Sequence, residues 1–318
     1  MRKLSIFLII FILAGSIVFA QQRRRYKYKS VEWKKDRNKV FFNLGATNFL
    51  GDLGGANKIG SGPFSLRDFD YQAIRPSIQL GYKYQFARHF SSRSFFNYSW
   101  LSGNDANTKE IFRQNRNLNF RTPIYELASA IEYSYEFNQN GHRYNLGGVR
   151  GFGGWSAFSY TPYAYVGVGG YYFNAKGKYA GKWNALRTLT TEGEGLVSTR
   201  KQYSPLQFTI PLGIGLRVRI SKAWEIGIEY TQNICFTDYI DDVSTTYFDK
   251  NALLNSKGGQ LSVDMANPAL NNSPGSRLYT STLPGEQRGD PKRKDSFMSL
   301  TLNVYCSLGR RFFPKHRF

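Results

Sequence analysis

The sequence predicts an all-β fold, an eight-stranded antiparallel up-and-down transmembrane β-barrel with long extracellular loops. Eight segments alternate apolar residues with small, polar or charged ones, and beyond the first twenty residues no stretch is apolar enough for a membrane helix. The 318-residue chain is 16% aromatic, yet its mean hydropathy is only -0.44. A polar interior and aromatic girdles at both membrane surfaces give a barrel this composition.

The alternation is clearest in residues 208–220, FTIPLGIGLRVRI. Phe208, Ile214 and every second residue around them are apolar, whereas Arg217 and Arg219 fall on the opposite face. Successive side chains of a strand point to opposite faces of the sheet. One face of this strand is therefore expected to meet lipid and the other the lumen.

The first four predicted strands each carry apolar residues at every second position. They span 40–50 (Val40, Phe42, Leu44), 74–86 (Ile78, Leu80, Tyr82), 93–101 (Phe96, Tyr98, Trp100) and 124–137 (Leu127, Ile131, Tyr133). The last four follow the same pattern, and the parity of the first of them, PYAYVGVGGYYF, is ambiguous. They span 159–173, 206–220, 224–239 and 297–313 (Leu300, Leu302, Val304). Each is close to or longer than the ~10 residues that a tilted strand needs to cross a bilayer.

The ends of the chain are predicted to lie outside the barrel. Residues 1–20 resemble a secretory signal, with Arg2 and Lys3 before an apolar core and a small-residue cleavage site at Ala20. An uncleaved anchor helix is the alternative. Residues 21–39 form a basic arm, 40–313 the barrel and 314–318 a tail.

The connections predict how the barrel is oriented. Short segments join most strands at one end and long ones at the other, and long loops belong outside the cell. Both termini are therefore expected in the periplasm of a bacterial outer-membrane protein, with the longest loop, 240–296, outside. The Gly-rich connection 138–158 is long for a periplasmic turn. Pro76 and Pro211 lie inside strands, and we expect a bulge near the rim to accommodate each.

Charged residues recur on the inward faces and predict an electrostatic network in the lumen. An eight-stranded barrel is just wide enough for side chains to fill it, so these charges should pair as a plug. An ion or proton path is the alternative. The predicted members are Arg75, Lys83, Glu126, Glu132, Arg217, Arg219, Glu225 and Glu229.

Few residues favour other chemistry. The histidines His89, His142 and His316 are expected on the periplasmic side, where they provide no base for a catalytic site in the outer loops. We therefore expect no enzyme activity and no cofactor. Asp238, Asp241 and Asp242 cluster where a strand ends and raise the question of calcium binding. Cys235 and Cys306 are expected on opposite faces, too far apart for a disulfide.

The formal net charge of +21 indicates an anionic partner. An exported chain rarely meets nucleic acid, so anionic headgroups of outer-membrane lipid or an acidic protein are expected instead. Basic residues concentrate at the predicted periplasmic end. The candidates for docking a partner are Arg23, Arg24, Arg25, Lys34, Lys35, Arg143, Arg150, Arg310 and Arg311.

Three segments carry a resemblance to a known family. NLGATNFLGDLGG (43–55), PYAYVGVGGYYF (162–173) and TDYIDDVSTTYFD (237–249) resemble the PorG-like outer-membrane barrel proteins of the Bacteroidetes, which are associated with type IX secretion and gliding. The resemblance implies a non-enzymatic barrel that holds a periplasmic ring of this machine to the outer membrane. It also implies the partners, a sulfatase-like ring lipoprotein and its companion ring subunit. A small porin-like channel and an outer-membrane enzyme acting on lipid or peptide remain the alternatives.

Overall fold

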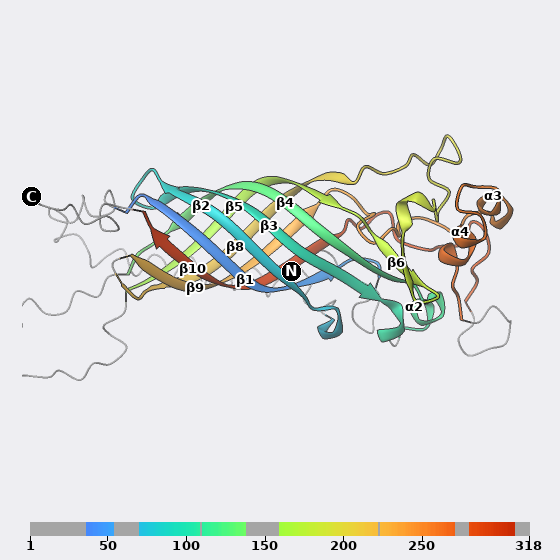
Figure 1. The fold of residues 1–318 in the computed structure, drawn as a ribbon, viewed down its shortest axis with the longest axis horizontal. Helices are drawn as coiled ribbons and strands as arrows, with labels where there is room; N and C mark the ends of the chain where they lie inside the picture. Colours follow the sequence, from blue (N-terminus) through green and yellow to red (C-terminus); the bar gives the residue numbers. More distant parts are fainter. Residues whose placement is uncertain are drawn as a thin grey trace, which may run out of the picture.

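The protein is a closed antiparallel barrel of eight strands. The computed structural model describes residues 36–53, 70–108, 110–137, 159–221, 223–270 and 280–308. The sheet runs in the order β3-β2-β1-β10-β9-β8-β5-β4, and pairing of β3 with β4 closes it (Figure 1). Closure leaves no open edge among these strands, which satisfies the backbone of a chain in lipid. The predicted fold class is confirmed.

The barrel strands are long. They are β1 (Asn38–Leu50), β2 (Arg75–Gln85), β3 (Phe90–Asn104), β4 (Asn119–Ser134), β5 (Tyr160–Phe173), β8 (Leu206–Arg219), β9 (Trp224–Cys235) and β10 (Ser296–Ser307). β1 begins before the predicted boundary, so Lys39 belongs to the barrel and not to the basic arm. β10 ends at Ser307, and residues 309–313 of the predicted last strand lie outside the described residues, as do the predicted signal 1–20 and tail 314–318.

The two faces of the sheet differ as the alternation predicts. Leu127 on β4, Val168 on β5 and Leu302 on β10 are exposed at about 70% on the outside. Glu126 and Glu132, on the opposite face of β4, are fully buried. A soluble protein would bury the aliphatic side chains and expose the carboxylates. The inverted arrangement is that of a membrane barrel with a polar interior.

The two ends of the barrel differ in what connects the strands. At one end, here called the turn end, β2 joins β3 and β8 joins β9 through a few residues. The other, the loop end, carries the β6 (Lys176–Tyr179) and β7 (Lys182–Ala185) hairpin and the helices α2 (Ile111–Arg116), α3 (Lys250–Leu254) and α4 (Gly259–Ala266) (Figure 1). Short 3-10 turns η3 (Tyr71–Ala73), η4 (Asp105–Asn107) and η6 (Leu186–Thr188) complete it. None of the helices in the described ranges is long and apolar enough to cross a membrane.

The predicted bulges at the two prolines are wrong. Pro76 pairs with Ala46 and Pro211 with Asn233 without any shift of register along the strands. Between β5 and β8 the ladder passes over Gly167 and Val168 and resumes with Gly169 opposite Thr209 in the same register. Loss of the proline N–H thus interrupts pairing locally and needs no extra residue.

An apolar cluster fills the mouth of the barrel at the loop end. The rings of Phe49 and Phe120 meet edge to face with centroids 4.8 Å apart, and Phe173 and Phe297 lie close to Tyr171. All five side chains are almost completely buried. The cluster continues into the loop segments above, so the loop-end structure packs on the barrel as part of the same core.

Glycines on β8 make room for the rings of two tyrosines on the neighbouring strand β5. A Cβ at Gly213 would overlap the ring of Tyr165, and a Cβ at Gly215 would overlap the ring of Tyr163. Gly213 is the cross-strand partner of Tyr165, and Gly215 is that of Tyr163. Each ring therefore lies over a position of the adjacent strand that has no side chain, in a lumen only wide enough for side chains.

Replacing Gly213 with Val should therefore destabilise the folded barrel by about 1–3 kcal/mol or more, because overpacking forces the ring of Tyr165 out of place. Samples of each variant are heated to a series of temperatures and run on an SDS gel. The temperature above which the compact, folded band disappears measures the effect. Gly170→Val is the matched control, because a Cβ there meets no atom closer than 3.8 Å. Equal losses in the two variants would contradict the packing argument.

Candidate functional site

A charged layer crosses the lumen and is centred on Glu132 of β4. Its carboxylate accepts hydrogen bonds from Lys83 of β2 and from Arg217 of β8, the latter at 2.7 Å. Arg93 of β3 lies 3.6 Å away from it. Since a buried carboxylate is costly unless it is paired, one anion holds three cations from three different strands.

A second anion, Glu229 of β9, completes the layer. Arg93 Nη1 donates to it at 2.8 Å, and the hydroxyls of Tyr163 and Tyr165 donate at 2.7 and 3.1 Å. The Arg93 guanidinium also lies 4.1 Å from the centroid of the Tyr165 ring, close enough for a cation–π contact. Arg93 therefore bridges both carboxylates.

The third anion, Glu225, lies nearer the turn end. Lys39 Nζ donates to it at 2.7 Å, and Arg219 reaches it at 3.1 Å. The Arg219 side chain is 35% exposed and also pairs with Glu136. This part of the network marks the passage from the closed interior to solvent at the turn end.

The predicted network is thus assembled in part. Lys83, Glu132, Arg217, Glu225 and Glu229 come together in the lumen, and Arg219 joins them from the turn end.

Two predicted members do not join. Arg75 is exposed, and its guanidinium donates to the backbone carbonyls of Gln72 and Ile74. The alternation of β2 predicts that Arg75 points inward. Arg75 is the first residue of β2, at the loop end, where the alternation no longer places its side chain in the lumen. Glu126 is buried, but it accepts only a hydrogen bond from Asn97 at 3.0 Å, and none of the described basic groups pairs with it.

Sequence reasoning missed Arg93, Lys39 and both tyrosines. Arg93 shares parity with Asn97, opposite to Phe96 and Tyr98, so the alternation of β3 contained the signal. Lys39 was assigned to the basic arm because it follows directly on a run of basic residues.

The charged layer closes the lumen. Arg93, Glu132 and Tyr305 are 0% exposed, and Lys83 and Arg217 are 2% exposed. A water-filled pore at this level would leave its lining accessible to solvent. The apolar cluster at the loop end lies above this layer, so a solute would meet two barriers. The observed packing fits the predicted plug better than the predicted ion path.

A second buried network holds the loop-end segments together. Arg288 donates to Glu192 at 2.8 Å and to the carbonyl oxygen of Asp242 at 2.8 Å. The Asp242 carboxylate accepts hydrogen bonds from Thr191 and Tyr203, both at 2.6 Å. These contacts fix the segment after β9 against the segment after β7.

Carboxylates outnumber cations in this region. Asp241 accepts from the backbone N–H groups of Leu53 and Val243, and Asp295 accepts from that of Ile240. Burial raises the pKa of Asp238 to about 8. Burial and neighbouring carboxylates likewise raise the pKa of Asp241 and of Asp295.

The question of calcium at Asp238, Asp241 and Asp242 finds no support in this arrangement. Within the described ranges, no three or more His, Cys, Asp or Glu side chains are placed to hold a metal ion. The carboxylates of Asp241 and Asp242 are occupied instead by protein N–H and O–H donors. Their role in the structure is to accept hydrogen bonds from the loops.

Other predicted residues have different outcomes. Cys235 and Cys306 are free thiols, as expected. His89 stacks on Tyr135 at the turn end with ring centroids 5.4 Å apart, while His142 and His316 are outside the described residues. The same holds for the connection 138–158 and for all nine docking candidates, Arg23, Arg24, Arg25, Lys34, Lys35, Arg143, Arg150, Arg310 and Arg311.

Known proteins resemble the chain in fold but not in sequence. The neisserial surface protein NspA is 7% identical over 85% of this chain and 97% of that one, with a TM-score of 0.35. Ail of Yersinia pestis, solved with the heparin analogue sucrose octasulfate, is 9% identical over 85% and 98%, with a TM-score of 0.34. OprG of Pseudomonas aeruginosa is 10% identical over 86% and 94%, with a TM-score of 0.28.

A comparison with curated protein sequences returns no match. One family model matches residues 28–264, which include β1 to β9 of the barrel and most of the loop-end structure. Its description is Domain of unknown function (DUF6089). The chain belongs to this family, DUF6089.

Proposed function

We propose that this protein is a non-enzymatic outer-membrane barrel that anchors the periplasmic ring of a type IX secretion or gliding machine. In this proposal the turn end faces the periplasm and the loop end faces outside. The ring partner is a sulfatase-like lipoprotein together with its companion subunit, as the resemblance to PorG-like barrels implies.

The sealed lumen is the observation that carries the proposal. A barrel whose interior is filled by Glu132, Glu229 and their cations has no evident passage for solutes. The protein must then act through its ends and its outer wall. The described residues that flank the segments with the predicted docking residues lie at the turn end, at the start of β1 and β5 and at the end of β4 and β10.

Photocrosslinking tests the docking. A photoreactive residue replacing Arg24 or Arg150 should capture a periplasmic lipoprotein in intact cells, whereas the same probe replacing Lys250, which is exposed at the loop end, should not. Capture of lipid alone by the probes at both Arg24 and Arg150 would contradict the proposal.

A small channel is the second candidate, and conductance in planar bilayers separates it from an anchor. Because Arg93 and Glu132 are inaccessible to water, we expect no steady current from the purified protein. A stable ohmic current that scales with the amount of inserted protein would favour the channel.

A further inference from the structure

A cavity of about 560 Å³ lies on the outer wall of the barrel at the loop end. Pairing of β2 with β3 stops at Ser77 and Ser99, whereas β3 and β4 remain paired as far as Asn104 and Asn119. The outer face of this β3–β4 extension forms the floor of the cavity. The start of β2 and η3 form one wall, and the β6–β7 hairpin forms the other.

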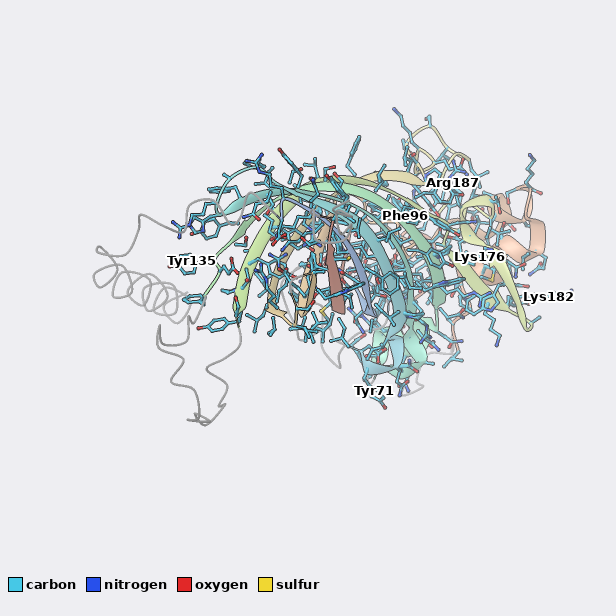
Figure 2. All side chains as sticks on the ribbon, turned by 60° about the vertical axis from the view of Figure 1, so that its left-hand side comes forward. Tyr71, Phe96, Tyr135, Lys176, Lys182 and Arg187 are labelled. Atoms are coloured by element: carbon cyan, nitrogen blue, oxygen red, sulfur yellow. The ribbon has the colours of Figure 1, made fainter. Side chains whose placement is uncertain are left out.

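Basic groups line the cavity and acidic groups do not. Arg75, Arg121 and Lys178 contribute to its lining, together with Trp100 and Trp183, and no Asp or Glu is among the described lining residues. Figure 2 shows Lys176 and Lys182, at the two sides of the hairpin, at this same end of the barrel beyond Phe96. The positive charge of this site therefore attracts anions.

Arg121 is held ready for a ligand. Its guanidinium lies 3.9 Å from the centroid of the Trp183 ring and 5.8 Å from that of Trp100. The buried Nε has no hydrogen-bond partner, and none of the described carboxylates forms an ion pair with this residue. Stacking fixes the plane of the guanidinium, so little side-chain freedom is lost when it binds a phosphate through two N–H groups.

The depth of the cavity matches the headgroup region of a bilayer. On the outer face below it, Trp100 is followed by the Tyr98–Tyr125 pair, then by Phe96 and Leu127. A second aromatic pair, Phe90 with Tyr133, ends the band near the turn end. The ten residue steps from Trp100 to Phe90 on β3 at ~3.3 Å each, tilted by ~40°, span about 25 Å, the height of a lipid-facing band between aromatic girdles.

We propose that this cavity binds the phosphorylated headgroup of a membrane glycolipid in the leaflet at the loop end. Arg121 and Lys178 contact the phosphate from above the Trp100 girdle, while the acyl chains lie along Phe96 and Leu127 below. The choice of a glycolipid rests on the proposed orientation, which places the loop end in the outer leaflet. The phosphate contacts themselves do not depend on the docking of a ring.

Binding of lipid A, a diphosphorylated glycolipid, to the full chain in detergent micelles tests the proposal. Native mass spectrometry should show lipid A retained on the wild type, with phosphatidylcholine and inorganic phosphate retained at least about tenfold less. The Arg121→Gln, Lys178→Gln double variant should weaken lipid A binding by about tenfold or more. Trp183→Phe should weaken it less, because it removes part of the stacking on Arg121 but no charge.

Lys250→Gln is the matched control, since Lys250 is an exposed basic residue of the loop end outside the cavity. It should bind lipid A as the wild type does. Compact mobility on an unheated SDS gel shows that each variant is folded. Equal binding by wild type and folded double variant would overturn the proposal, as would inorganic phosphate retained as well as lipid A.

Discussion

Replacing Glu132 with Gln is expected to lower the free energy of unfolding of the barrel by about 3–5 kcal/mol, the usual cost of breaking a buried ion pair. Glu132 faces Lys83, Arg93 and Arg217 at a level of the lumen that excludes water. A neutral amide has almost the same shape as the carboxylate but carries no charge, so the three buried cations lose the anion that compensates them. Urea unfolding in detergent micelles, followed by tryptophan fluorescence, measures the change.

Glu126→Gln is the control for this substitution. Glu126 is equally buried on the same strand, but its carboxylate accepts only the amide of Asn97. A glutamine side chain can keep that hydrogen bond through its own oxygen, so the loss should stay below about 1 kcal/mol. Similar losses in the two variants would contradict the view that Glu132 organises the charges of the lumen.

The loop-end structure should become less stable as pH rises from about 5 to 8.5. Burial raises the pKa of Asp238 and of Glu194 to about 8 and that of Asp242 to about 6. The folded loops therefore bind more protons than the unfolded loops do, whose carboxyls titrate near 4. The stability that these carboxyls contribute is fully present below their pKa in the unfolded state. It is lost as the pH rises toward their pKa in the folded state.

Limited proteolysis of the loop end by a protease active over this range measures the effect. One pKa unit corresponds to about 1.4 kcal/mol, so we expect cleavage between β9 and β10 to be about tenfold faster or more at pH 8.5 than at pH 5, after correction for cleavage of an unfolded peptide. Asp238→Asn should reduce this ratio, because its neutral amide cannot ionise. Slower cleavage at pH 8.5 would contradict the assignment.

The strands could be predicted from the sequence because their outward face meets one uniform solvent. Lipid selects an apolar side chain at every second position, as at Leu127 and Ile131 on β4, and this regular pattern needs no knowledge of the fold. The interior is less regular. On β5, Tyr163 and Tyr165 face the lumen while Ala164 and Val166 face lipid. The larger side chains of this strand therefore lie inside the barrel, and their size gives no sign of the face that meets lipid.

The pairing within the lumen could not be predicted, because parity gives the face of a residue but not its height in the barrel. Glu126 and Glu132 share a face, and only the register with β3 and β5 shows that Glu132 lies among the cations. The prediction that Arg75 joins the network was wrong for a related reason. At the end of a strand, the alternation no longer determines the face to which a side chain points.

The loop-end structure was the least predictable part. Arg116 forms a salt bridge with Asp105 at 2.7 Å, and Arg288 pairs with Glu192 across a sequence separation of 96 residues. Such contacts carry no periodic signal. The cavity beside Arg121 is equally non-local, because its walls come from β2, β3, β4 and the β6–β7 hairpin.

Spin labels placed along β4 test the central claim, a lipid-embedded barrel with a closed interior, most directly. Cysteines at Leu127 and Ile131 face outward, and cysteines at Ala128 and Ala130 face the lumen, in a chain whose native Cys235 and Cys306 are replaced by Ser. Labels at the outward positions should collide with oxygen dissolved in lipid and not with a water-soluble nickel chelate, and labels at the inward positions should collide with neither. Collision with nickel at Ala128 or Ala130 would reveal a water-filled pore, and collision with nickel at Leu127 or Ile131 would show that this wall does not lie in lipid.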